Sequence, residues 1–182
     1  MKMATAKTPA KRAAKVTAAA TMPPIPGQLW KEHKAIYIGI MRSADGKLAW
    51  HLLLPVGTKF QTKGIYGCYG KKIAGADCRF DGDANTVAMA KAGSEIAIKA
   101  LALPDGCYIP SRAESALLYA VAPDEFKTDS YYMTSTQYSE YGAWMQYFAY
   151  GHQYDYLKFN ERRVRFVRRL VIDSFNPLNS AA

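Results

Sequence analysis

The sequence has little cysteine, and its few cysteines are not arranged to hold a metal ion or a disulfide framework. The 182 residues include three, Cys68, Cys78 and Cys107, at spacings that match no CxxC metal pair. An odd number also argues against the dense disulfides of small secreted scaffolds. We therefore expect reduced thiols in a protein assembled in the cytoplasm.

Long apolar runs are also missing. No stretch approaches the roughly 18 consecutive apolar residues of a membrane span, and the N-terminus lacks the apolar core of a signal peptide. The sequence thus predicts no membrane span and no secretion signal.

Patterns typical of catalytic or metal sites are absent too. The three histidines, His33, His51 and His152, show no ligand spacing, and no Gly-x-Ser-x-Gly or Cys-His arrangement stands out. His51, beside Trp50 in an expected strand, is better explained as an ordinary partly buried residue. We expect no enzymatic activity, no catalytic residue and no cofactor.

One acidic segment has the beginning of a calcium loop. Asp81, Asp83 and Asn85 match its first oxygen ligands, but Thr86 replaces the required glycine and Ala92 the bidentate glutamate. A polar turn that caps the following helix is the better explanation, and we expect no metal.

The positive charge is concentrated at the N-terminus. The net charge is +9, and the first 22 residues contribute five cations and no acid, which leaves +4 for the remainder. This segment offers little to bury, so we expect it to be disordered alone and to act as an anchoring arm through Lys7, Lys11, Arg12 and Lys15. Its partner is either a neighbouring subunit or a nucleic acid.

Proline and glycine mark the end of this arm. We predict a basic arm and proline-rich linker over 1–27, one folded domain over 28–174 and a tail over 175–182.

The folded part has an α+β pattern. Alternating and β-branched segments predict a hairpin of strands 35–41 and 47–54 around Ala44-Asp45-Gly46, followed by irregular glycine-rich chain over 57–80. Residues 86–103 predict one interrupted helix or two short ones, and the Ser111-x-x-Glu114 capping box predicts a helix over 112–121. Three further strands are expected over 130–136, 142–150 and 163–172.

Tyrosine is concentrated near the C-terminus, where eight of the thirteen tyrosines lie between residues 131 and 156. Tyrosines interleaved with small polar residues are typical of binding surfaces, because they offer contact area with few torsions to freeze. Strand alternation predicts that Trp144 and Phe148 point inward. The tyrosines in or beside expected loops are the candidate binding residues: Tyr138, Tyr141, Tyr150, Tyr154 and Tyr156.

The arginines of residues 162–169 allow two interpretations. Arg163, Arg165 and Arg168 have the planar donor geometry that binds phosphate or carboxylate. Alternatively they face water or pair with acids such as Asp155 and Glu161, as the arginines of a closing strand commonly do.

Three segments resemble a known family. IPSRAESALLY, YYMTSTQYSEYGAWMQYFAYG and ERRVRFVRRL are similar, in that order, to the Lcl C-terminal type domain, which is common in phages and prophages. Residues 106–170 match the family's order, and AIYIGIMRSADGKLAWHLLLP looks like the opening hairpin of its phage members. One departure is Tyr132-Met133, where the family commonly has a tryptophan.

The resemblance implies a C-type-lectin-like fold with about two helices, small antiparallel sheets and long loops that recognise glycans or proteins. It also implies a phage virion component on the tail tip or capsid surface, assembled in the host cytoplasm with other virion proteins, and a homo-oligomer. The sequence lacks the Glu-Pro-Asn and Gln-Pro-Asp triplets of calcium-dependent lectins. Two alternatives remain: a decoration or cementing protein without receptor binding, and a basic protein associated with nucleic acid.

Overall fold

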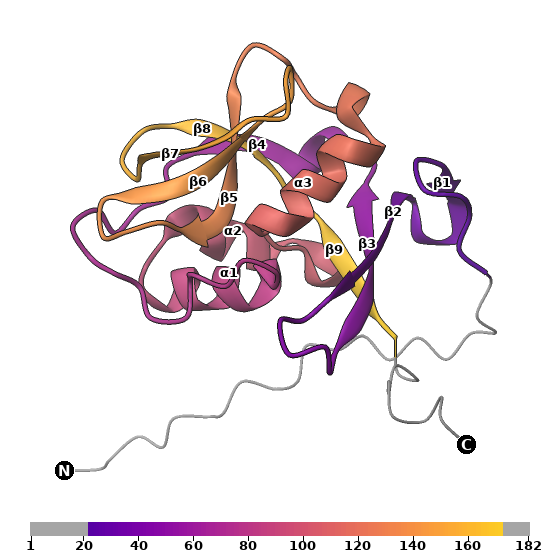
Figure 1. The fold of residues 1–182 in the computed structure, drawn as a ribbon, viewed down its shortest axis with the longest axis horizontal. Helices are drawn as coiled ribbons and strands as arrows, with labels where there is room; N and C mark the ends of the chain where they lie inside the picture. Colours follow the sequence, from indigo (N-terminus) through magenta and orange to yellow (C-terminus); the bar gives the residue numbers. More distant parts are fainter. Residues whose placement is uncertain (1–21, 173–182) are drawn as a thin grey trace.

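The structure is a computed structural model that describes residues 22–172, drawn in Figure 1. It is a mixed α+β fold with two sheets and three α-helices, as the sequence predicts in outline. Lys7, Lys11, Arg12 and Lys15 of the predicted arm and the predicted tail over 175–182 lie outside the described residues.

A four-stranded antiparallel sheet has the order β1-β2-β3-β9. Its strands are β1 (Leu29–Trp30), β2 (Ala35–Arg42), β3 (Ala49–Pro55) and β9 (Arg168–Val171). The predicted hairpin is confirmed as β2 and β3, and its turn is closed by hydrogen bonds between Ser43 and Leu48.

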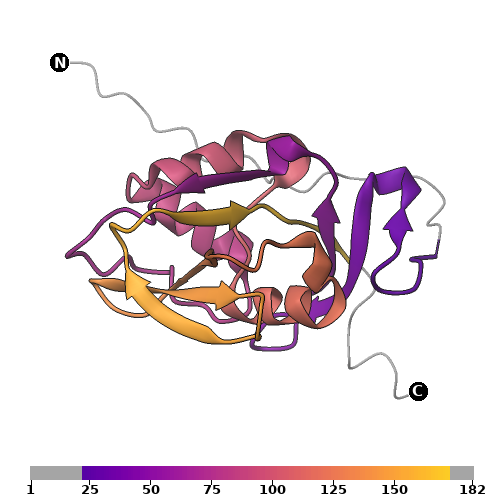
Figure 2. The ribbon, with the colours of Figure 1, turned by 90° about the horizontal axis from the view of Figure 1, so that it is seen from above.

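A five-stranded sheet has the order β4-β8-β5-β6-β7, with β5 and β8 parallel and the other pairs antiparallel. Its strands are β4 (Gln61–Gly64), β5 (Tyr131–Gln137), β6 (Gly142–Tyr147), β7 (Gln153–Leu157) and β8 (Arg162–Arg165). The outer strands of the two sheets lie at opposite ends of the molecule in both views, with β1 and β2 far from β6 and β7 (Figures 1 and 2).

Of the two predicted alternatives for residues 86–103, the pair of short helices is confirmed, as α1 (Gly82–Lys91) and α2 (Glu95–Ala102). Gly93 lies between them with a φ of 93°, a backbone conformation that glycine adopts without strain. Asp81 caps α1 by accepting a hydrogen bond from the Ala84 amide, so the predicted capping role is confirmed.

The third helix, α3 (Arg112–Val121), begins with the predicted capping box. The Ser111 hydroxyl accepts from the Glu114 amide, and the Glu114 carboxylate accepts from the Ser111 amide. Four single-turn 3₁₀ helices connect the larger elements: η1 (Lys31–His33), η2 (Thr58–Phe60), η3 (Pro104–Gly106) and η4 (Pro123–Glu125).

The five-stranded sheet is covered on both faces. One face packs against α1 and α2 through a core that includes Met89, Ile96, Met133, Met145 and Val164. The other packs against α3 and the following segment through Leu118, Phe126, Tyr132 and Phe148. Phe148 points inward as predicted, whereas Trp144 on the same face is only half-buried.

The prediction of one strand over 163–172 is wrong. The chain changes sheets at Phe166 and Val167, so that β8 lies between β4 and β5 in the five-stranded sheet and β9 forms an edge of the four-stranded one. Both residues are fully buried, and Val167 exchanges backbone hydrogen bonds with Tyr108. Two consecutive buried residues interrupt the alternation of a single strand, because each of them faces the interior on a different side of the change of sheet.

The interpretation of residues 153–157 as loop is also wrong. They form β7, the outermost strand of its sheet, which pairs with β6 alone. An edge strand is half-solvated and rich in polar residues, so its sequence gives a weak strand signal. Among the described residues the longest helices, α1 and α3, have ten residues each, and none meets the length and hydropathy of a membrane span.

Candidate functional site

Six aromatic side chains form one continuous surface over β5, β6 and β7. We call this surface the tyrosine strip: Tyr131, Tyr147, Tyr150, His152, Tyr154 and Tyr156. The rings of Tyr131 and Tyr147 stack with centroids 4.7 Å apart, and Tyr131 also contacts Tyr156 at 4.7 Å. Tyr150, His152 and Tyr154 continue the path from Tyr147 back to Tyr131 at spacings of 5.8 to 6.5 Å. Five of the rings therefore form a closed circuit.

Strand register explains why these rings share a face. Tyr131 of β5 lies opposite Tyr147 of β6, and Tyr154 of β7 lies opposite Met145 of β6. Alternate residues of a strand point to the same face, so Tyr156 follows Tyr154 to the face that carries Met145. This face packs its centre against α1 and α2, and the tyrosines lie where that cover ends.

Exposure divides the strip into a base and a rim. Tyr131, Tyr147 and Tyr156 are half-buried, whereas 73% of Tyr150 and 53% of Tyr154 are exposed. A hydrogen bond with Tyr156 is the main reason why the pKa of Tyr131 is raised. The guanidinium of Arg162 in β8 lies 4.9 Å from the Tyr156 ring centroid and borders the strip on one side.

The turn between β6 and β7 fixes the position of the rim. Gly151 has a φ of 76°, and a Cβ built there would lie 2.5 Å from Cε1 of Tyr119 in α3. The turn is held by hydrogen bonds from the Gly151 amide to the Tyr147 carbonyl and from the Tyr147 amide to the His152 carbonyl. Because only glycine fits against Tyr119, the helix sets the placement of Tyr150 and His152.

The structure brings together three of the five predicted binding residues. Tyr150, Tyr154 and Tyr156 belong to the strip, and Tyr154 and Tyr156 lie in a strand rather than a loop. Tyr138 lies elsewhere, with its ring edge-on to Trp144 at 5.3 Å. Arg112 stacks on Trp144 at 3.6 Å.

Tyr141, the fifth predicted residue, belongs to a second aromatic cluster. Its ring contacts Tyr69, which contacts Phe159 in turn, and about half of each side chain is exposed. Next to this cluster, the fully buried Lys158 connects the segment of Lys71 with the end of β5. Its ammonium donates to the Lys71 carbonyl and to the Gln137 side chain. Burial lowers the pKa of Lys158.

Sequence reasoning missed Tyr131, Tyr147 and His152 of the strip. Tyr131 and Tyr147 lie in predicted strands, and the candidate residues were the tyrosines in or beside loops, although alternation places Tyr147 on the face away from Phe148. Recognition of β7 would have placed Tyr154 and Tyr156 on the same face as Tyr147. These residues were missed because the sequence did not indicate β7 as a strand.

The candidate anion-binding arginines each bind different partners. Arg163 bonds both carboxylate oxygens of Asp129, and Arg165 donates to the carbonyls of Pro55 and Gly57. Arg168 pairs with Asp105 and donates to the His33 carbonyl. Their partners are thus neither Asp155 nor Glu161, the acids that the sequence suggested.

A buried polar network, which we call the Glu114 centre, lies between the sheets. The fully buried Glu114 carboxylate accepts hydrogen bonds from Trp50 Nε1, Tyr108 Oη and the amides of Gly82 and Ser111, at 2.6 to 3.2 Å. Burial raises the pKa of Glu114 to about 7, against the lowering effect of these donors. No atom of this carboxylate reaches solvent, so the centre is suited to holding the fold.

Arg169 completes the surroundings of the Glu114 centre. Its guanidinium lies 5.1 Å from the Trp50 ring centroid and pairs with Asp81 at 2.8 Å and Asp83 at 3.1 Å. The two acids that resembled a calcium loop are therefore bound to an arginine. Within residues 22–172 no group of three His, Cys, Asp or Glu side chains is placed to hold a metal ion.

Comparison with known proteins adds no family to this description: no protein-family model and no curated protein matches the chain.

Proposed function

We propose that the chain is a non-enzymatic binding domain that recognises a glycan or protein surface through the tyrosine strip. The observation that carries this proposal is the closed circuit of rings whose rim, Tyr150 and Tyr154, is mostly exposed. Tyrosine combines a large apolar area with a hydroxyl that donates and accepts hydrogen bonds, and few of its torsions are lost on binding.

The form of the strip favours an extended ligand. The two pockets described for this structure are lined by residues of β4, β5, β8 and α2 and by Ile65, not by the rings of the strip. A row of rings suits the flat faces of sugar rings or a broad protein surface. Nucleic-acid platforms combine such rings with a basic groove, whereas Arg162 is the one cation found over a ring of the strip among the described residues.

We place this domain in a phage virion, as a C-type-lectin-like component on the tail tip or capsid surface that is anchored through its basic arm. The resemblance to the Lcl C-terminal type domain supports this setting. The three segments that carry the resemblance coincide, in order, with α3, with β5 and β6, and with β8 and β9. Host-surface glycan or protein would then be the ligand, and other virion proteins and further copies of the chain the assembly partners.

A second candidate function is a decoration or cementing protein, and the open edge of β7 supports it. This strand pairs with β6 alone, so its outer backbone groups can add a strand from a neighbouring subunit. In that case Tyr154 and Tyr156 would be buried in the assembly instead of meeting a receptor.

The test combines the double variant Tyr150→Ser/Tyr154→Ser with the control Tyr138→Ser, which changes an exposed tyrosine outside the strip. Labelled full-length protein is applied to a glycan array and to bacterial cells. Each rim tyrosine should contribute about 1–2 kcal/mol, so the double variant should bind at least about tenfold more weakly while the control binds normally. Equal binding by all three proteins would contradict the proposal.

Sedimentation of the same proteins distinguishes the second candidate function, cementing, from recognition. If the strip cements subunits, the wild-type chain should form oligomers that the double variant loses, and neither protein should bind cells.

A further inference from the structure

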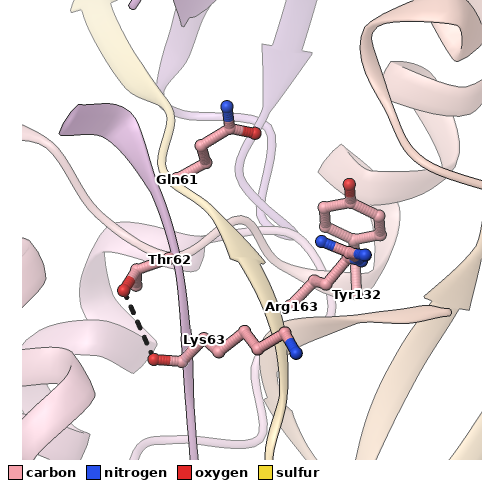
Figure 3. Close-up of a pocket in the computed structure, with 5 residues that line it drawn as sticks. All are labelled: Gln61, Thr62, Lys63, Tyr132 and Arg163. Carbon is pink, nitrogen blue, oxygen red and sulfur yellow. Dashed lines mark hydrogen bonds between the residues drawn. The ribbon is translucent and has the colours of Figure 1, made fainter. Parts of the chain in front are cut away.

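A pocket of about 210 Å³ lies on the opposite face of the five-stranded sheet from the tyrosine strip. It is lined by Gln61, Thr62 and Lys63 of β4, Tyr132 of β5 and Arg163 of β8. Figure 3 shows Lys63 and Arg163 extending from adjacent strands, with the guanidinium of Arg163 beside the Tyr132 ring. Two cations therefore line a small polar hollow.

The strand register makes this arrangement unusual. Lys63 and Arg163 are direct cross-strand partners, and Tyr132 is the partner of Arg163 on its other side. Like charges that lie directly opposite across two strands destabilise a sheet. The neighbouring pair on the same face is Gln61 with Arg165, which adds a third positive charge.

Nearby acids compensate only part of this charge. Asp129 bonds Arg163 NH2 through both oxygens at 3.1 and 3.2 Å, and its own side chain is 67% exposed. Arg163 Nε is buried without a hydrogen-bond partner among the described residues, and no ion pair of Lys63 is found there. The Lys63 ammonium is thus available to an anion, and Arg163 already binds one carboxylate.

We infer that this pocket binds the carboxylate of an acidic ligand between Lys63 and Arg163. The ligand oxyanion separates the two like charges, accepts from the lysine ammonium and the free donors of the guanidinium, and competes with Asp129 for Arg163. This site does not depend on the tyrosine strip, because the two lie on opposite faces of the sheet.

The probe is sodium glucuronate, with methyl glucoside as the neutral match and inorganic phosphate as the second oxyanion. Full-length ¹⁵N-labelled protein is titrated at constant ionic strength, and the amide and arginine Nε–H signals are followed by NMR. Glucuronate should shift the signals of Lys63, Tyr132 and Arg163 to saturation, while methyl glucoside should leave them in place. A response to phosphate as strong as that to glucuronate assigns the site to oxyanions in general, whereas a response to phosphate alone overturns the carboxylate assignment.

Variants give changes of opposite sign. Lys63→Gln should weaken glucuronate binding about fivefold, and Asp129→Asn should strengthen it about threefold because the internal competitor is removed. The control Lys72→Gln removes an exposed cation elsewhere and should change nothing. Unchanged binding in Lys63→Gln, or weaker binding in Asp129→Asn, would overturn the inference. Both changed side chains lie at the surface, so the variants should fold.

Discussion

The Glu114 centre and the tyrosine strip use polar groups in opposite ways. Every donor around Glu114 points inward to one carboxylate, and Arg169 is paired with two aspartates. The strip leaves the rings of Tyr150 and Tyr154 open to solvent. A titratable group with a shifted pKa and an exposed aromatic surface can each indicate a functional site. Here only the aromatic surface is accessible to a partner. Accessibility therefore separates the residues that hold this fold from those available for binding.

The largest expected effect is on the Glu114 centre. Glu114→Ala leaves Trp50 Nε1, Tyr108 Oη and two backbone amides without their acceptor in a buried site. We expect the free energy of unfolding to fall by about 3–5 kcal/mol, measured by urea denaturation. The control is Glu95→Ala, which removes an exposed glutamate and should change stability by less than about 1 kcal/mol. Similar stabilities for the two variants would contradict the structural role of Glu114.

The next effect is on pH dependence. Burial raises the pKa of Glu114 to about 7 from an ordinary value of 4.5, so the folded state holds its proton more tightly. The contribution of Glu114 to the free energy of unfolding is complete below pH 4.5 and is lost as the pH rises through 7. The total loss is about 3 kcal/mol. Urea denaturation at pH 5 and 7.5 measures the difference in the free energy of unfolding between the two pH values. Glu114→Gln should remove the part of this difference that Glu114 contributes.

Other groups titrate in the same range, so the comparison with Glu114→Gln decides. Burial lowers the pKa of His33 and His51, whose contributions are lost as the pH falls and therefore act in the opposite direction. A wild-type and Glu114→Gln difference that is constant between pH 5 and 7.5 would contradict the shifted pKa.

An intermediate effect connects the two regions through α3. Gly151→Ala places a methyl group against Tyr119 at a φ of 76°, so we expect a loss of about 2–3 kcal/mol and weaker binding through the displaced rim. Gly70→Ala is the matched control, since its φ is 78° and nothing lies within 4 Å of the added Cβ. It should cost only about 1 kcal/mol by urea denaturation. Equal losses would show that contact with Tyr119 does not fix the turn.

The smallest expected effect on stability is in the strip itself. Tyr150→Ser/Tyr154→Ser removes rings that are 73% and 53% exposed, so thermal and urea unfolding should change by less than about 1 kcal/mol. This expectation sharpens the contrast, because the same variant should lose binding. A large loss of stability would instead assign the rim tyrosines to the fold.

Much of the fold follows from local signals in the sequence. The β2–β3 hairpin, the capping box of α3 and the Asp81 cap depend on residues close together in the chain, and all three were predicted. The split of 163–172 was not, because it depends on the pairing of β8 with β4 and β5 and of β9 with β3, all of which are distant in the sequence.

The candidate site was predicted in part for the same reason. Exposure of Tyr150 and Tyr154 could be expected from their polar surroundings, but the contact of Tyr131 with Tyr147 and Tyr156 depends on the pairing of three strands. The donors to Glu114 likewise come from β3, from the start of α1 and from the segment before α3, up to 64 residues away. Neither the strand pairing at the strip nor the hydrogen bonds to Glu114 can be inferred from a single sequence.

The described chain both enters and leaves through the four-stranded sheet, where β1 and β9 occupy the two outer positions. The strands that carry the tyrosine strip, β6 and β7 among them, lie at the other end of the molecule (Figure 1). An attachment made directly at residue 22 or at residue 172 would thus lie far from these strands. Residues 22–172 can be fixed to a sensor surface at either point without the attachment covering the strip.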